Sequence, residues 1–145
     1  MKFITKVIDM KYLIRCSNAD DLKDILPVSK MHPNYVYGSK FFHMTDWDEG
    51  QDIRLLVKEK YDGSWVKTIV NISDLWSDQE VNRVSHILSL AEEYPTIADV
   101  KALCRRDPIR VVEHEGNMFL LDGNTRCILL SIYGETKVEV MQLLI

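Results

Sequence analysis

The amino-acid sequence predicts a mixed α/β (α+β) domain, and three observations lead to this fold class. Between about residues 77 and 106, apolar residues recur at helical spacing, and helix-capping residues precede them twice. Residues 109–121 contain two short apolar runs around turn residues, as in a β-hairpin. After residue 121 the pattern becomes helical and then returns to that of a strand. We expect these helices to pack on one mixed sheet.

Length and composition fit a single folded domain with an N-terminal extension. The chain has 145 residues, and 46% of them are hydrophobic, which suffices for a packed core. Charged residues, among them Lys2, Lys6 and Asp9, interrupt the first apolar run, unlike in a signal peptide or a membrane span. We therefore expect a cytoplasmic protein without a membrane partner.

Charge and cysteine content argue against two kinds of site. A formal net charge of −4 does not suit a surface that grips nucleic-acid backbones throughout, although the arginines in 105–110 could form a local basic patch with Arg126. Cys16, Cys104 and Cys127 are widely spaced and form no C-x-x-C pair. This spacing predicts reduced thiols in or near the core rather than disulfides or a zinc site.

The first fifty residues give three predicted elements and one unassigned stretch. Residues 3–8 and 11–16 have the pattern of strands, and 18–26 that of a short helix that Pro27 ends. Residues 27–50 contain aromatic side chains without a clear period. No element is predicted there.

A β-hairpin is predicted next. Residues 52–60 and 65–73 are the two strand-like runs, and Asp62-Gly63 between them supplies residues that tolerate positive φ in a tight turn. We therefore expect these two runs to pair with each other.

Two capped helices follow. Ser77 and Glu80 form a capping-box pattern, and the apolar spacing after them predicts a helix as far as Tyr94. Thr96 and Asp99 repeat the capping pattern and predict a second helix, which ends with two arginines near the negative end of the helix dipole.

The C-terminal third has the clearest pattern. Two short strands are predicted in 109–121, with a turn at 115–117. A helix through 125–133 follows, and Gly134 suits the left-handed conformation that ends many helices. Residues 137–144 have the pattern of a final strand.

The junction "DGNTR", residues 122–126, predicts an anion site. Gly123 has no Cβ, so a phosphate could approach the backbone, and the free amides of Asn124, Thr125 and Arg126 would point towards it at the helix start. Arg126 could add a bidentate contact. An arginine in the first turn of a helix opposes the dipole unless a negative partner compensates. This mismatch is the physical reason to expect a bound phosphate.

The stretch "RDPIRVVEHEGNMFLLDGNTRCILLSIYGETKVEV" resembles the ParB/sulfiredoxin-like family. It has a proline-led strand, a hairpin partner, a D-G-x-x-R junction, a helix, a glycine and a closing strand. A weaker likeness extends back over "TIVNISDLW", so that the resemblance covers about residues 66–144. We therefore divide the chain into an N-terminal extension, 1–65, packed on the same sheet, and a ParB/sulfiredoxin-like domain, 66–145.

The resemblance implies nucleotide binding, with ATP or CTP as the ligand and Mg²⁺ as a possible companion. The phosphates would then lie on Gly123 and Arg126. Sulfiredoxins have a cysteine two places before the arginine, where this chain has Asn124, which argues against sulfinic-acid repair. Related nucleotide-dependent serine kinases have D-G-H-H-R, in which Asp122 matches the acidic residue, while Asn124 and Thr125 replace the histidines.

Two other activities of the family find little support. Chromosome-partitioning members bind CTP and continue into DNA-binding and dimerisation domains, and this chain ends at Ile145, so we do not expect a complete partitioning protein. Some relatives have been described as nucleases, but the sequence offers no metal-binding carboxylate cluster for that reaction.

Each candidate site residue has a structural alternative. Asn124 or Thr125 could serve only as a helix N-cap, with Arg126 as an exposed, solvated side chain. Asp122 could be a general base or a metal ligand beside a phosphate, or could only shape the turn.

The neighbouring arginines and histidines have alternatives of their own. Arg105, Arg106 and Arg110 could contact phosphates, but a helix end and an exposed strand face already explain them. No metal-ligand spacing joins the histidines, and His114, in a hairpin turn, is expected to be exposed. Five aromatic residues could line a binding face for a base or a partner, but we favour a place in the core for them. They are Phe41, Phe42, Trp47, Trp65 and Trp76.

Two functions follow from these patterns. The first is a protein that binds a nucleotide or another phosphate-bearing ligand at 122–126, with a Mg²⁺-dependent phosphotransferase or nucleotide hydrolase as its enzymatic form. The second is a noncatalytic module that keeps the fold and binds a protein or nucleic-acid partner through its N-terminal extension.

Overall fold

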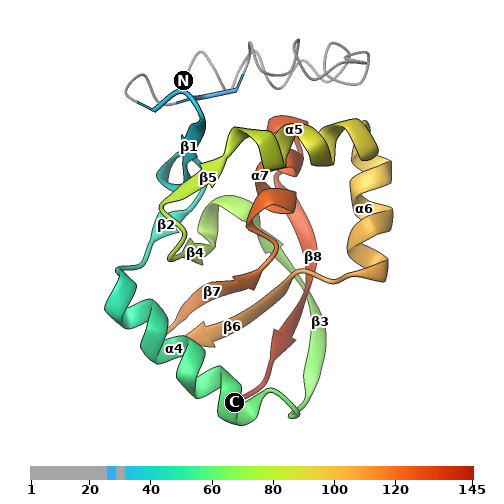
Figure 1. Ribbon diagram of the computed structural model, residues 1–145. Coiled ribbons are helices and arrows are strands. Elements are labelled where there is room, and N and C mark those ends of the chain that lie inside the picture. Colours follow the sequence, from blue (N-terminus) through green and yellow to red (C-terminus); the bar gives the residue numbers. More distant parts are fainter. Residues whose placement is uncertain (1–25, 29–31) are drawn as a thin grey trace.

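The computed structural model describes residues 26–28 and 32–145 (Figure 1). The strands are β1 (Tyr35–Tyr37), β2 (His43–Met44), β3 (Trp65–Asn71), β4 (Trp76–Ser77), β5 (Val81–Arg83), β6 (Arg110–His114), β7 (Asn117–Asp122) and β8 (Lys137–Leu143). The helices are α4 (Trp47–Lys60), α5 (Val84–Glu93), α6 (Ile97–Arg106) and α7 (Asn124–Ile132), with 3-10 turns at Gly38–Lys40 and Ile72–Asp74. The strands predicted at 3–8 and 11–16, and nearly all of the helix predicted at 18–26, lie outside the described residues.

A six-stranded mixed sheet organises the fold, in the order β2-β4-β7-β6-β8-β3. β6 pairs with β7 antiparallel and with β8 parallel, and β8 pairs with β3 antiparallel. β4 pairs parallel with both β7 and β2. β1 and β5 form a separate antiparallel pair. The predicted mixed α/β (α+β) class is therefore confirmed.

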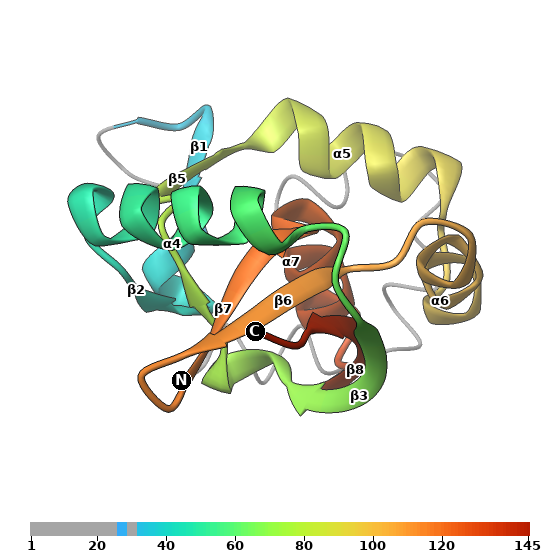
Figure 2. The ribbon, with the colours of Figure 1, turned by 90° about the horizontal axis from the view of Figure 1, so that it is seen from below.

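The central strands present alternate side chains to two clusters of buried residues. Val111 and Leu120 belong to the larger cluster, to which α5, α6 and α7 also contribute. Val112 and Phe119, the next residues along the same strands, belong to the smaller cluster under α4. Because successive side chains of a strand point to opposite faces, α4 covers one face of the sheet and α7 the other. Figures 1 and 2 place α4 and α6 on opposite sides of the molecule.

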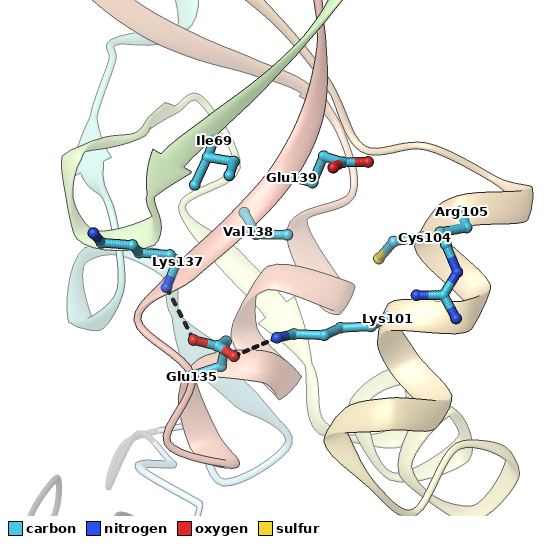
Figure 3. A pocket seen from close by; sticks show the side chains of 8 residues that line it. All are labelled: Ile69, Lys101, Cys104, Arg105, Glu135, Lys137, Val138 and Glu139. Carbon is cyan, nitrogen blue, oxygen red and sulfur yellow. Dashed lines mark hydrogen bonds and ion pairs between the residues drawn. The ribbon is translucent and has the colours of Figure 1, made fainter.

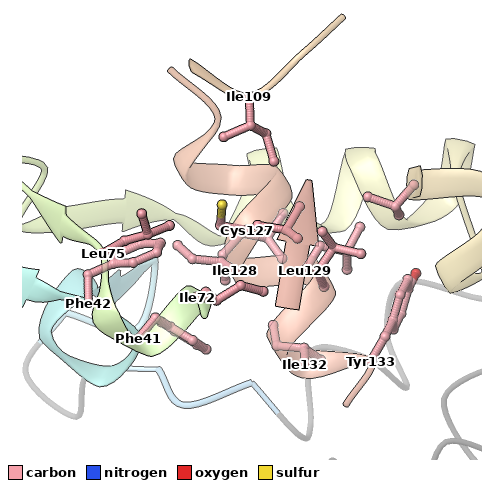
Figure 4. Close-up of a cluster of buried hydrophobic side chains, with 14 of the residues drawn as sticks. Phe41, Phe42, Ile72, Leu75, Ile109, Cys127, Ile128, Leu129, Ile132 and Tyr133 are labelled. Atoms are coloured by element: carbon pink, nitrogen blue, oxygen red, sulfur yellow. The ribbon is translucent and has the colours of Figure 1, made fainter. Parts of the chain in front are cut away.

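Helix α7 lies at the centre of the larger cluster (Figure 4). Five of its apolar side chains are buried, namely Cys127, Ile128, Leu129, Leu130 and Ile132. A helix that is apolar on nearly all sides belongs in the middle of a core rather than at its edge. Cys127 is therefore a core thiol, as predicted, and Cys16 lies outside the described residues.

The aromatic residues divide between the core and the surface. Phe41 and Phe42 are buried in the larger cluster, while Trp65 and Trp76 pack against the smaller one. Their predicted role in the core is confirmed. Trp47, at the start of α4, is instead 67% exposed.

The hairpin predicted from 52–60 and 65–73 is wrong in its first half. Residues 52–60 belong to helix α4, and β3 pairs with β8 over its whole length. A strand would place Ile53, Leu55 and Val57 on one face, but only Ile53 and Val57 are buried, whereas Leu55 is 64% exposed. Two buried residues four positions apart, with an exposed residue midway between them, fit a helix rather than a strand. The Asp46 carboxylate caps this helix by accepting from the Glu49 amide at 2.8 Å.

The start of the next helix is also corrected. α5 begins at Val84, not at the predicted capping box, because Ser77 belongs to β4 and the chain first forms β5. The Ser77 hydroxyl is engaged elsewhere: it accepts from the Gln79 amide and donates to the Asn124 side chain. The helix ends at Glu93 with Tyr94 as its C-cap residue, in agreement with the predicted end.

The remaining C-terminal predictions are confirmed. The capping box of α6 is present, with the Asp99 amide donating to Thr96 Oγ1 at 3.1 Å and the Thr96 amide donating to Asp99 Oδ2 at 3.2 Å. Glu115 and Gly116 form the β6–β7 turn at positive φ, and Gly134 has φ 90° just after α7. Among the described residues, no helix is long and apolar enough to cross a membrane.

Candidate functional site

All five residues of the predicted anion site line one cleft of about 540 Å³. It opens where β7 passes into α7, and α5 and α6 pack against α7 beside it (Figure 1). The lining residues are Arg54, Gln79, His86, Ser89, Leu90, Glu93, Leu103, Asp107, Leu121, Asp122, Gly123, Asn124, Thr125 and Arg126. Its size is within the usual range of small-molecule sites.

Gly123 is required by the backbone and by packing. Its φ is 111°, a conformation that other residues adopt rarely. A Cβ at this position would lie 2.7 Å from Cγ1 of the buried Ile109 side chain. The glycine therefore allows the tight β7–α7 junction, whether or not a phosphate approaches it.

The first turn of α7 offers backbone amides to the cleft. The N-cap residue is Gly123, which has no side chain to accept hydrogen bonds from the amides of Asn124, Thr125 and Arg126. The Asn124 side chain is buried, and its Oδ1 accepts from Ser77 Oγ at 2.6 Å, which ties α7 to β4. The Asn124 side-chain oxygen is therefore already engaged, while Thr125 is half-buried.

Arg126 is buried, which corrects the expectation of an exposed side chain; only 7% of the residue is accessible. Its Nη1 donates to the backbone carbonyl of Asp107. The same nitrogen lies 3.7 Å from Asp107 Oδ2, and Nη2 lies 3.6 Å from Asp122 Oδ2. The chain itself thus supplies negative partners for this arginine.

Arg110 completes a network of two arginines and two aspartates. Its Nη1 lies 3.8 Å from Asp107 Oδ1 and 3.9 Å from Asp122 Oδ2. It is half-buried, with its guanidinium 5.9 Å from the centroid of the Trp65 ring, so it does not lie on an open strand face as predicted. Asp122 keeps a side chain that is 60% exposed. One of its oxygens faces the arginines, and the carboxylate remains accessible from the cleft.

Two predicted members of the basic patch are not brought into this network. Arg106 donates to the Tyr94 hydroxyl at 3.4 Å. Arg105 lines a different cavity. The structure therefore joins Arg110 and Arg126 through their shared aspartates, and the four arginines do not form one patch.

Arg54 is a cleft residue that the sequence interpretation missed. Its Nε and Nη2 donate to the Asp78 carboxylate at 3.0 and 2.8 Å, and Nη1 donates to the Leu121 carbonyl at 3.2 Å. Hydrogen bonding to Asp78 raises the pKa of Arg54 above its ordinary value. The helical spacing of apolar residues in 52–60 was the signal that could have revealed this residue. Arg54 is next to the buried Ile53 in α4, and its side chain reaches the sheet at Leu121.

A second cavity of about 350 Å³ lies between α6 and the β8–β3 edge (Figure 3). Lys101 Nζ forms an ion pair with Glu135 Oε2 at 2.7 Å at its rim. The Cys104 thiol faces this cavity. Burial raises its pKa by more than the nearby Arg126 lowers it, so the pKa lies above its ordinary value. Burial also raises the pKa of Cys127. Neither thiol has the depressed pKa of a reactive cysteine.

Comparisons with known proteins do not identify the chain. No protein-family model, curated protein or solved structure matches it. The ParB/sulfiredoxin-like resemblance therefore depends on the sequence pattern of about residues 66–144 alone.

Proposed function

We propose that the chain binds a nucleotide, ATP or CTP, or another phosphate-bearing ligand in the cleft at the start of α7, as a ParB/sulfiredoxin-like domain. One observation carries the proposal: the five residues singled out in the sequence line a single cleft at the N-terminus of a nine-residue helix. Helix amides without a side-chain cap, together with the positive end of the helix dipole, favour an anion there.

The charges of the cleft favour a nucleotide bound together with a divalent cation. Two guanidinium groups, Arg54 and Arg126, line it alongside three carboxylates, Glu93, Asp107 and Asp122. A phosphate without a counter-ion would meet repulsion from those carboxylates. Mg²⁺ takes carboxylate and phosphate oxygens together, so Asp107 and Asp122 fit as its protein ligands. The ion would neutralise charge on the phosphates.

Binding through Arg126 also requires an exchange of partners. Its guanidinium already contacts the Asp107 carbonyl and two carboxylates. A phosphate must compete with these groups, and a cation held by the aspartates would free the arginine for that contact. We therefore expect tight binding only in the presence of Mg²⁺.

The enzymatic form of the proposal assigns Asp122 the role of general base or metal ligand. Its exposed carboxylate is accessible to an acceptor, as either role requires. The reaction would be phosphoryl transfer to an acceptor hydroxyl or to water, so the chain would act as a phosphotransferase or nucleotide hydrolase.

The second candidate is a noncatalytic module that binds a protein or nucleic acid. Two observations favour it: the close approach of Ile109 explains Gly123, and internal partners satisfy Arg126. Neither residue then needs a ligand. In this case the cleft is a by-product of the fold, and the partner contacts another surface.

A thermal-shift panel separates the two candidates. ATP, CTP, GTP, UTP and inorganic phosphate are each tested with and without Mg²⁺, since a ligand that binds the folded state raises the melting temperature by mass action. We expect one nucleotide together with Mg²⁺ to raise the melting temperature. The control variant Arg106→Ala, which changes a residue outside the cleft, should show the same shift as the wild type. A flat panel would favour the noncatalytic module.

A further inference from the structure

A group of metal-ligating side chains lies where the tip of the β6–β7 hairpin meets the first turn of α4. Glu49, His114 and Glu115 each offer one ligand atom there, and these atoms all lie within 4.8 Å of one another. None of the three lines the cleft at the start of α7. Two distant parts of the chain therefore meet around one small volume.

The backbone fixes the positions of these residues. The amide of Glu49 donates to the N-cap carboxylate of Asp46, which sets the first turn of α4. His114 ends β6 opposite Asn117, and Glu115 follows it in the tight turn with φ 51°. The His114 side chain is 28% exposed, so half-burial restricts its ring, contrary to the exposure expected from the sequence.

Within the described residues, the only ion-pair partner of this group's two glutamates is the group's own histidine. Across residues 26–28 and 32–145, no lysine or arginine forms an ion pair with Glu49 or Glu115. The contact of Glu115 is with His114, whose Nε2 lies 3.9 Å from Oε1. Asp78 and Glu135, by contrast, each form an ion pair with an arginine or a lysine. Two adjacent carboxylates without such a partner leave room for a cation.

The ligand set selects the class of cation. One imidazole nitrogen and two carboxylate oxygens suit Zn²⁺ and Mn²⁺, whereas Mg²⁺ prefers oxygen ligands alone. Ligand atoms about 2.1 Å from a tetrahedral ion are separated by about 3.4 Å, so the gaps between the ligand atoms must shorten by up to about 1.4 Å. The two glutamates are exposed and can make this adjustment.

We propose that Glu49, His114 and Glu115 form a binding site for a divalent transition-metal ion, with Zn²⁺ as the preferred ion. The ion joins α4 to the β6–β7 hairpin and keeps positions open for water or a further ligand. Its binding stabilises the folded chain, because the unfolded chain does not bring residue 49 near residues 114 and 115. This site is independent of nucleotide binding.

The first test measures affinity on the full chain after chelator treatment. Zn²⁺ titrated by calorimetry should bind at one equivalent and raise the melting temperature by several degrees. His114→Ala should weaken this binding at least about tenfold, since even the loss of an outer-shell partner of a metal costs that much. Glu113→Gln, an exposed neighbour on β6, should bind like the wild type. Unchanged affinity in His114→Ala, with the fold intact by circular dichroism, would overturn the site.

The second test locates the ion without relying on a variant. Mn²⁺ added in substoichiometric amounts broadens the amide NMR signals of nearby residues. We expect broadening centred on 46–50 and 113–117. Broadening centred on Asp107 and Asp122, or the absence of any localised effect, would show that the ion does not bind at the hairpin.

Discussion

Arg126 holds together the two segments that meet at the start of α7. Its guanidinium donates to the Asp107 carbonyl just after α6, and it lies between the carboxylates of Asp107 and Asp122. Removing this buried arginine costs stability, because truncation takes away its hydrogen bond to the Asp107 carbonyl and both of its ion pairs, although the two carboxylates stay exposed to solvent. The same residue is thus a structural anchor and the proposed phosphate contact.

Replacing Arg126 should therefore affect both stability and binding. We predict that Arg126→Ala lowers the free energy of unfolding by about 2–3 kcal/mol, the scale of lost hydrogen bonds to charged groups, and abolishes nucleotide binding. Arg106→Ala, on the exposed face of α6, should change stability by less than about 0.5 kcal/mol. Urea unfolding and calorimetry of both variants give the comparison. Equal stabilities would show that the Arg126 pairs contribute nothing to the fold.

Asp122 tests the chemistry rather than the fold. Asp122→Asn keeps the shape of the side chain, and the exposed position makes the effect on stability small. If Asp122 acts as a base, turnover should fall by at least ~100-fold, the usual scale for such a loss, while nucleotide binding persists. Phosphate release measured in a single turnover decides this. Equal rates would remove Asp122 from the mechanism, and an inactive wild type would support the noncatalytic module.

Helix α4 covers the face of the sheet opposite to α7. Ile53 and Val57 insert into the smaller cluster with Val112 and Phe119, and Leu55 points to solvent. The helix also carries Arg54, which reaches across to Asp78 and the cleft. One element therefore supports the sheet and contributes a side chain to the proposed site.

The packing of α4 predicts unequal costs for two similar substitutions. Ile53→Ala should lower the free energy of unfolding by about 2–4 kcal/mol, because it removes buried methyl groups and leaves a cavity. Leu55→Ala deletes a side chain of the same size but should cost less than about 1 kcal/mol, since leucine and alanine have similar helix propensities. Chemical denaturation measures both. Equal large losses would place Leu55 in the core, as a strand at 52–60 requires.

The sequence was most informative where a local rule and the tertiary structure agree. The capping box at Thr96 and Asp99, the turn at Glu115-Gly116 and the glycine after α7 involve neighbouring residues, and all three are confirmed. Ser77 followed the same capping pattern, but its hydroxyl bonds a residue 47 positions away. A short sequence window cannot reveal such a long-range partner, and Ser77 lies in β4 rather than at a helix start.

At the scale of the whole molecule, the two buried clusters share β6 and β7 and so depend on each other. Each strand presents one set of side chains to α7 and the alternate set to α4. The sequence predicted the cleft residues from Asp122 to Arg126 because these are contiguous in the chain. Asp107, Arg54 and His86 come from other elements, and only the packing of α4, α5 and α6 around the sheet brings them to the same place.

Residues before Ser64 should be necessary for the cooperative fold of the rest. The described part of this segment pairs β2 with β4, buries Phe41 and Phe42 in the larger cluster and covers Val112 and Phe119 with α4. A chain that begins at Ser64 would expose those apolar surfaces, so we predict an insoluble or molten product. Near-ultraviolet circular dichroism, dye binding and urea unfolding, each compared with the full chain, test this. If the shortened chain unfolds cooperatively and still binds the nucleotide, the first 63 residues form a separate appendage, and partner recognition becomes their more plausible role.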